Sequence, residues 1–404
     1  MGQKFYTESG RTMSAKTTGD CIESANSPLA YKADGIVTLK TPQLEPPMHG
    51  IRVATRALAG MQKEALVAQS FDETVWRIVC DEGPYLNGTD LAPPPLAFFS
   101  AGMASSIAAG VLSLAKDRGT KLSDLRIVLD NRFSMEGSAI KGTMIAGALP
   151  VELSVSAHVA GRNPNLNSLV FSGLSKSPVD ALMRENLVDT FSIVRNSQPL
   201  PTELVEASAN PTPDDPAGLF SMHRYVQHRQ ALTDAVSKLE TTESVFEADH
   251  GAGAATKNIQ KRQLHIRSNL VVRNDGLREV KVQIFKPIGS VFRFLSDDSP
   301  VFGGLGRAPS GLAYVSAGVA FCFMTQLGRY AGIVKKNLDS YGVIQDTTFD
   351  VGEGRTLPVD THTYIETTED QETTQKYVDM GEQTCFLHGA CRMSNKTRIK
   401  IIGS

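Results

Sequence analysis

The feature that most constrains the fold is an internal repeat. Residues 75–106 align without a gap on residues 291–322, at an offset of 216, with 13 identities in 32 positions. At ordinary composition, about two or three identities would arise by chance. A repeated unit of this size usually buries its apolar face against a neighbouring copy. The chain is therefore a tandem duplication.

Changes in composition divide the chain into four parts. Residues 1–45 are rich in Ser, Thr, Gly and Pro and are expected to form a mobile or draped arm. Residues 46–197 form the first copy, and residues 261–404 form the second. Between them, residues 198–260 are a Pro-rich linker that carries a predicted helix at about 217–241.

Hydrophobic periodicity gives the elements within each copy. The first copy is predicted to contain strands at 51–58, 74–79, 125–129 and 150–159, an apolar helix at 96–115 and a second helix at 178–195. The second copy opens with strand-like residues 264–267 and 271–273 and contains an apolar helix at 312–334. Both apolar helices lack a polar face, and a helix of that kind is normally buried. The sequence therefore predicts an α+β intramolecular pseudo-dimer, with these two helices packed together in the core and the sheets outside them.

Composition excludes several partners. Charged residues are 21% of the chain and the net charge is −2, so nucleic acid and an anionic membrane surface are poor candidates.

The polar start is not a signal peptide, and no run of 18 apolar residues exists. Five cysteines, an odd number, favour free thiols in a reducing compartment. We expect a cytoplasmic protein.

Comparison of the two copies points to two thiols. Cys322 lies in the apolar helix of the second copy, and the offset places Ser106 opposite it. Aligning the last predicted helices places Cys385 opposite Thr190. Both thiols are thus replaced by hydroxyl residues in the first copy, which suggests one active and one degenerate copy. The alternative for a buried cysteine is an inert, small hydrophobic side chain.

The motifs of the second copy occur in the order Ser296-Asp-Asp-Ser-Pro300, Gly303-Gly304, Ala308-Pro-Ser-Gly311, Ala317-Gly-Val-Ala-Phe-Cys322 and Glu382-Gln-Thr-Cys385. The first copy has the matching Asp81-Glu-Gly-Pro84, Asn87-Gly88, Ala92-Pro-Pro-Pro95 and Ala101-Gly-Met-Ala-Ser-Ser106. This pattern resembles the OsmC/Ohr family of thiol-dependent peroxide reductases.

The resemblance implies two long central helices wrapped by antiparallel sheets, with the thiols near the subunit interface. It implies that Cys322 is the nucleophile toward an organic hydroperoxide and that Cys385 resolves the oxidised thiol as a disulfide. It further implies a small-molecule substrate, an external thiol reductant and no cofactor or metal. The protein would be a monomeric pseudo-dimer or a higher homo-oligomer.

One departure from the family pattern concerns activation of the thiol. The family's Glu near the start of the central helix is absent, because neither residues 310–314 nor residues 94–98 contain a carboxylate. A thiolate needs a nearby cation or a helix N-terminus, and Arg293 and Arg307 are the preferred candidates, with Arg273 and Arg278 behind them. His388, one turn from Cys385, is a candidate proton donor or base.

Two functional alternatives to peroxide reduction remain open, and a zinc site is not favoured. Cys322 could instead serve a hydrolase or lyase that acts on a small organic substrate. The fold could also be a non-catalytic module that binds a small molecule. Cys385-x-x-His388-x-x-Cys391 offers three potential zinc ligands, but no second pair supports a zinc site.

Overall fold

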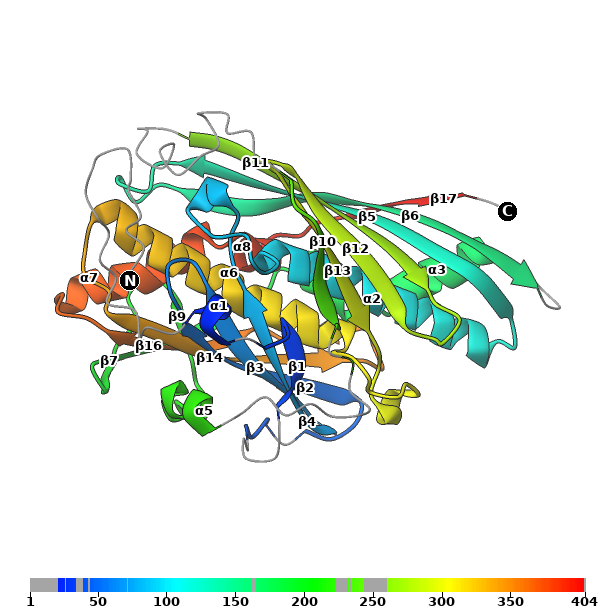
Figure 1. Cartoon of the computed structure of the whole chain (residues 1–404), viewed down its shortest axis with the longest axis horizontal. Coiled ribbons are helices and arrows are strands. Elements are labelled where there is room, and N and C mark those ends of the chain that lie inside the picture. The colour runs from blue at the N-terminus through cyan, green and yellow to red at the C-terminus, as the bar shows by residue number, and fades with distance from the viewer. Residues whose placement is uncertain are drawn as a thin grey trace.

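The computed structural model describes residues 21–25, 27–33, 39–42, 44–70, 72–160, 165–222, 232, 234–242 and 260–402. Two long helices, α2 (Pro95–Asp117) and α6 (Gly311–Val334), form the central layer. One sheet covers each side of this layer (Figure 1). The protein is therefore a mixed α+β structure, as its sequence predicts.

Two small residues allow α2 and α6 to approach backbone to backbone. A Cβ on Gly102 would lie 2.4 Å from the carbonyl oxygen of Gly311, and a Cβ on Gly318 would lie 2.8 Å from the amide nitrogen of Phe99. Since real Cβ atoms do not come so close to backbone atoms, only glycine fits at these two positions. The predicted contact between the two apolar helices is observed.

The first sheet contains ten of the described strands. Its order is β1 (Ala30–Ala33), β4 (Asp72–Cys80), β3 (Lys63–Gln69), β2 (Met48–Ala57), β14 (Ser340–Asp350), β16 (Asp360–Glu366), β7 (Thr190–Arg195) and β8 (Gln198–Leu200), while β15 (Arg355–Thr356) pairs with β14 and β9 (Glu206–Ala207) pairs with β7. Only the β16–β7 and β7–β9 pairs are parallel.

The second sheet contains seven of the described strands. Its order is β10 (Val236–Glu240), β13 (Ile288–Ser296), β12 (Arg278–Lys286), β11 (Gln260–Val272), β5 (Lys121–Gly137), β6 (Ile145–Ala160) and β17 (Thr397–Ile401). In β6 the buried residues Val151, Leu153 and Val155 alternate with less buried ones, as expected of a strand with one face on the core.

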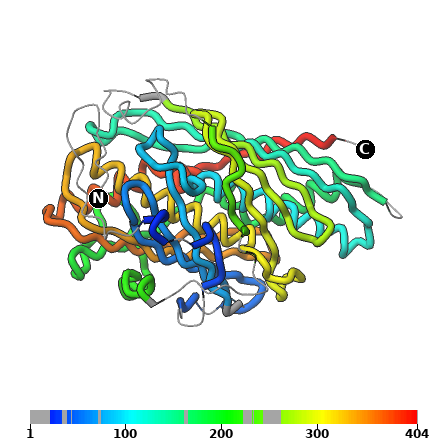
Figure 2. The backbone as a smooth tube through the Cα atoms, in the orientation of Figure 1, coloured from blue at the N-terminus to red at the C-terminus, as the bar shows by residue number. Residues whose placement is uncertain are grey.

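Each sheet combines strands from both halves of the chain. The β2–β3–β4 meander of the first half continues into β14 and β16 of the second half and ends on β7 of the first. The β11–β12–β13 meander of the second half continues into β5 and β6 of the first half and ends on β17 of the second. Figure 2 shows β5 and β11 side by side although they are far apart in the chain. The two sheets thus have the same strand order with the halves exchanged.

The remaining helices fall into two similar pairs and two single short helices. α3 (Leu166–Ser175) and α4 (Pro178–Arg184) contact α2, whereas α7 (Gln371–Thr384) and α8 (Phe386–Cys391) contact α6. α1 (Ile22–Ala25) and α5 (Ala217–Met222) are single short helices. Two 3-10 turns, η1 (Pro84–Leu86) and η3 (Pro300–Phe302), precede α2 and α6.

The predicted helix at 178–195 is wrong in its second half. α4 ends at Arg184, and residues 190–195 form strand β7, which lies beside β16. The Thr-Phe-Ser-Ile-Val segment has the β-branched and aromatic content of a strand, and the sheet contributed by the other half supplies its partner.

The predicted helix at 217–241 is also corrected. Among the described residues of this segment, 217–222 are helical, whereas residues 236–240 form β10 on the edge of the second sheet. Residues 223–231 lie outside the described residues. The linker takes part in both sheets, because β8 and β9 pair with β7. Within the predicted N-terminal arm, residues 30–33 form β1 on the edge of the first sheet.

By length and composition alone, α2 and α6 could each cross a membrane, but 72% and 89% of their apolar windows are buried inside the protein. The core helix of a globular protein passes the same test.

Candidate functional site

Cys322 lies in the middle of α6 and is 2% exposed. The thiol of Cys385 lies close enough to Cys322 for Cys322 to influence its ionisation. Burial, together with this contact, raises the pKa of Cys385 well above its usual range. The structure therefore brings together the two thiols that the sequence singled out.

Cys385 is positioned by a break between two helices. α7 ends at Thr384, and Cys385 adopts an extended conformation that makes it the N-cap of α8. Its sulfur accepts a hydrogen bond from the amide of His388 at 3.5 Å. An N-cap side chain that bonds to the third residue beyond it is held in one orientation, and here that orientation is toward α6.

The equivalence of Cys385 with Thr190 is wrong. Thr190 begins strand β7, whereas the residue that caps the corresponding helix α4 is Ser177. The Ser177 hydroxyl accepts a hydrogen bond from the amide of Asp180 at 3.4 Å. Ser177 is thus the counterpart of Cys385, so a hydroxyl still stands where the second copy has a thiol.

His388 lies directly beside Cys385. Its Nδ1 is 3.3 Å from the Cys385 sulfur, and the residue is fully buried. Burial and the nearby Arg392 lower the pKa of His388 to about 3, so the imidazole is neutral at physiological pH. A neutral imidazole can accept a proton from a thiol through the nitrogen that faces it.

Asp189 lies on the far side of the His388 ring. One carboxyl oxygen is 3.9 Å from Nε2 of His388, and the other accepts the amide of Val359 at 2.8 Å. Burial raises the pKa of Asp189 to about 7 against the opposing effect of the Val359 amide. Burial and the nearby Asp189 carboxyl raise the pKa of Cys391 well above its usual range. Asp189 comes from the first half of the chain and His388 from the second.

A cavity of about 20 Å³ opens beside Cys322. Cys322 lines this cavity together with three residues on the same face of α6. They follow it by three, four and seven positions and are Thr325, Gln326 and Arg329. The remaining lining comes from the β4–η1 turn, the start of α2, β11 and α8: Glu82, Tyr85, Leu86, Pro94, Pro95, Leu96, Arg262, Leu264 and Phe386.

Glu82 contributes a carboxylate to the lining of this cavity. It comes from the turn after β4, and it accepts hydrogen bonds from Thr325 at 3.0 Å and from Tyr85 at 3.3 Å. Burial raises the pKa of Glu82, and the nearby ammonium of Lys63 opposes that rise. The carboxylate belongs to the first half of the chain and faces the thiol of the second.

Two guanidinium groups, those of Arg262 and Arg329, line the same cavity. Burial and the nearby charge of Arg262 lower the pKa of Arg329 to about 9, which leaves it charged at neutral pH. Its Nη1 donates weakly to Gln326 at 3.4 Å. Its Nη2 is buried and has no hydrogen-bond partner among the described residues.

Arg293 and Arg307, the cations preferred from the sequence, lie elsewhere. Arg293 pairs with Asp234 at 2.5 Å, and Arg307 pairs with Asp297 at 2.8 Å. Neither lines the cavity beside Cys322. The strand Arg293 is therefore a structural ion-pair residue, and the cations near the thiol are Arg262 and Arg329.

Sequence reasoning missed Glu82, Arg262, Arg329 and Asp189 as site residues. The position of Arg329 could have been found, because seven residues from Cys322 is two turns along the same helix face. Glu82 and Asp189 come from the first half of the chain and Arg262 from β11 of the second half, and all three reach the site only through tertiary contacts between residues far apart in the sequence.

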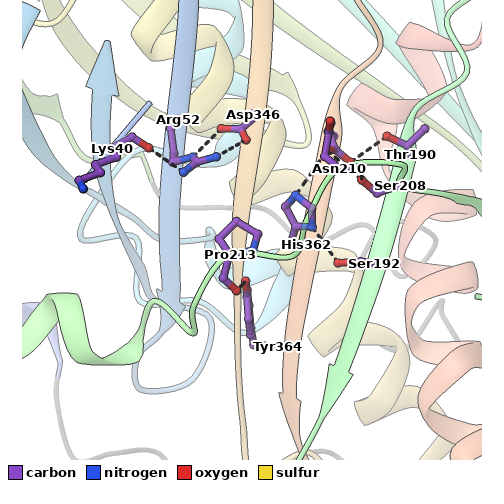
Figure 3. Close-up of polar contacts among 11 residues, drawn as sticks. Lys40, Arg52, Thr190, Ser192, Ser208, Asn210, Pro213, Asp346, His362 and Tyr364 are labelled. Atoms are coloured by element: carbon purple, nitrogen blue, oxygen red, sulfur yellow. Dashed lines mark hydrogen bonds and ion pairs between the residues drawn. The ribbon is translucent and has the colours of Figure 1, made fainter. Parts of the chain in front are cut away.

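A second polar network lies on β16 and β7 (Figure 3). Asp360 accepts hydrogen bonds from Thr190, Ser208 and Asn210 at 2.7–3.0 Å, and they help to lower its pKa to about 2 against the effect of burial. His362, 1% exposed, connects Ser192 at 2.8 Å with Asp360 at 3.4 Å.

This Ser–His–Asp arrangement attaches the linker to the sheet. The hydroxyl of Thr212 donates to Ser192, and the carbonyl of Pro213 accepts from Tyr364 at 2.6 Å. Phe220 and Tyr364 belong to a small apolar cluster near the same strands. Residues 208–213 thus lie across the pair Ser192–His362, so we interpret the network as structural.

Within the described part of the chain, no group of three or more His, Cys, Asp or Glu side chains is arranged to hold a metal ion. All five cysteines are free thiols.

No protein-family model and no curated protein matches the chain. Among solved structures, an OsmC-like hydroperoxide resistance protein from Jannaschia sp. CCS1 is 21% identical with a TM-score of 0.19, over 31% of this chain and 83% of that one.

Proposed function

We propose that the protein reduces a hydroperoxide through a pair of thiols, with Cys322 as nucleophile and Cys385 as the resolving thiol. The observation that carries the proposal is the proximity of these two thiols, close enough for Cys322 to raise the pKa of Cys385, together with the charged cavity that Cys322 lines. A reactive thiol next to a second thiol is the arrangement of a cysteine that is oxidised and then resolved as a disulfide.

The first step forms one bond and breaks another. The Cys322 thiolate attacks the outer oxygen of ROOH, the O–O bond breaks, and the products are a sulfenic acid on Cys322 and ROH. Arg262 and Arg329 supply positive charge near the thiolate and the departing alkoxide. Oriented cations in a partly dehydrated site stabilise developing negative charge more strongly than water does.

The second step joins the two sulfurs. Cys385 attacks the sulfenic sulfur, the S–O bond breaks and a disulfide forms. The proton of Cys385 passes through Nδ1 of His388, 3.3 Å away, to the departing hydroxyl, which leaves as water. An external dithiol then reduces the disulfide and returns both thiols. His388 is thus a general base for resolution and does not act on the peroxide.

We further propose that the chain is a dimer fused into one polypeptide. Two sets of contacts support this. The approach of Gly102 to Gly311 and Val315 is mirrored, at the repeat offset, by that of Gly318 to Pro95 and Phe99. Such an exchange of contacts is the signature of a two-fold interface. The exchanged strand order of the two sheets has the same symmetry.

The decisive experiment maps the thiols after peroxide treatment. Reduced protein is treated anaerobically with one equivalent of an organic hydroperoxide and digested without reductant. We expect a Cys322–Cys385 disulfide peptide and one equivalent of ROH. Cys385→Ser should still consume peroxide once and retain a sulfenic acid on Cys322, which a dimedone-type reagent would trap. Cys322→Ser should consume none.

Cys21→Ser is the matched control, because Cys21 lies outside the site and is half-exposed. Full turnover by Cys322→Ser would overturn the proposal. Oxidation of Cys322 in the wild-type protein without any linkage to Cys385 would also overturn it, and would favour the hydrolase, lyase or binding alternatives.

A further inference from the structure

The cavity beside Cys322 is lined by charged side chains from both halves of the chain. They include two guanidinium groups, Arg262 and Arg329, and one carboxylate, Glu82. The buried Lys63 also acts on the Glu82 carboxylate from outside the cavity. Glu82 therefore does not depend on Arg329 alone for a nearby positive charge.

Arg329 is the better placed of the two cations to bind a ligand. Two turns of α6, an axial rise of about 10 Å, separate its Cα from that of Cys322. Helical side chains lean toward the N-terminus of their helix, and for Arg329 that is the direction of the thiol. Its Nη2 is buried and has no hydrogen-bond partner among the described residues. A buried charged donor without a partner is unfavourable unless a ligand supplies an acceptor.

The first copy shows that packing does not require this cation. At the repeat offset, Thr325, Gln326 and Arg329 correspond to Ala109, Gly110 and Ser113. α2 thus forms the same central layer as α6 with no charged residue at the matching position. The charge of Arg329 accompanies the thiol of Cys322 and is absent where that thiol is replaced by Ser106.

We infer that Arg329 binds an anionic group, so that the electrophile that reacts with Cys322 carries a carboxylate or a similar small anion. This rests on the proposed function only in taking Cys322 as the nucleophile. The cavity of about 20 Å³ has room for little more than one water-sized group, so an electrophile that reaches Cys322 there must be small. The planar guanidinium binds a carboxylate with two parallel hydrogen bonds, for which the free Nη2 provides a donor.

Two alkylating reagents of nearly equal shape test this charge selection without any peroxide. Iodoacetate and iodoacetamide each transfer one carbon to the sulfur of Cys322 and release iodide, and they differ in the carboxylate. Rate constants at Cys322 are measured by peptide mass spectrometry, relative to the exposed thiol of a small peptide. We expect the ratio of iodoacetate to iodoacetamide rates to be higher at Cys322 than in the peptide.

Arg329→Gln should lower this ratio about tenfold, which is the usual effect of losing one charged hydrogen bond. Arg329→Lys keeps the charge and should restore part of the ratio. Arg293→Gln, which removes a cation outside the cavity, should leave it unchanged. In the wild-type protein, acetate should protect Cys322 from both reagents, and acetamide should not.

An unchanged ratio in a folded Arg329→Gln protein, or equal protection by acetate and acetamide, would overturn the inference. So would a failure of Cys322 to react with either reagent. The outcome is separable from the proposed function. Anion preference without a peroxide-induced disulfide would leave this inference standing and remove the reductase. A peroxide-induced disulfide without anion preference would do the reverse.

Discussion

Replacing Asp189 by Asn should make the protein more stable, by an amount that grows from mildly acidic to alkaline pH. The reason is that Asp189 is buried and its pKa is raised from 3.8 to about 7. Between these two values the unfolded chain releases the proton while the folded protein retains it. Unfolding therefore releases a proton, and stability falls as pH rises through this window.

The size of the effect follows from the shift. One pKa unit corresponds to about 1.4 kcal/mol, so the full shift is on the order of 4 kcal/mol above pH 7. Asn has the same shape, remains neutral, and keeps an oxygen for the amide of Val359, 2.8 Å from the present carboxyl oxygen. The substitution thus removes the unfavourable ionisation and preserves the hydrogen bond.

His388 produces the opposite slope at lower pH. Its pKa is lowered to about 3 from 6.5, so the unfolded chain binds a proton that the folded protein does not. Stability contributed by this residue rises with pH between these values. Between about pH 4 and 6.5 the pH dependence contributed by His388 cancels that contributed by Asp189. Above this range Asp189 should lower the stability of the wild-type protein as pH rises. Below this range His388 should lower it as pH falls.

The assay is urea unfolding of the reduced wild-type protein and Asp189→Asn at pH 5 and pH 8.5. At pH 8.5 the variant should be more stable by up to about 4 kcal/mol, and at pH 5 by about 1–2 kcal/mol, because part of the shift is already present there. Asp360→Asn is a control of opposite sign: the pKa of Asp360 is lowered to about 2, so its loss should destabilise the protein at both pH values. A variant that is no more stable at pH 8.5 than at pH 5, relative to wild type, would refute this reasoning.

Two further predictions concern the core and the thiols. Gly318→Ala should destabilise the protein by about 1–3 kcal/mol, because the new Cβ would meet backbone atoms of α2 at 2.8–3.0 Å. Thermal unfolding measures the effect, with Gly218→Ala as the control because a Cβ there has nothing within 4 Å. Equal effects of the two substitutions would count against tight packing of the helices. Oxidation that links Cys322 to Cys385 closes a loop of roughly 60 residues and should stabilise the protein by up to about 4 kcal/mol. Urea unfolding with and without dithiothreitol measures this gain in stability. A loss of stability on oxidation would mean that the two thiols cannot join without strain.

The sequence alone was sufficient to show the similarity between residues 75–106 and 291–322, to locate the two central helices and to single out Cys322 and Cys385, which the structure places close together. Each of these features can be recognised from the amino-acid sequence without knowledge of tertiary contacts. An apolar stretch such as 312–334 predicts a buried helix because no face of it can favourably meet water, and a gapless repeat is visible without any knowledge of contacts. The difference between Cys322 and Ser106 is likewise read from two aligned positions.

Only the tertiary structure decided what surrounds the thiols. Thr190 looked like a helical counterpart of Cys385, but a partner strand from the other half makes it part of β7. Arg293 looked like the activating cation, but it faces Asp234 across neighbouring strands. Glu82 and Arg262 reach Cys322 because the first half contributes the β4 turn and the second half contributes β11 to one cavity. Such contacts depend on how the two copies interlock, and no local pattern encodes them because the residues involved are far apart along the chain.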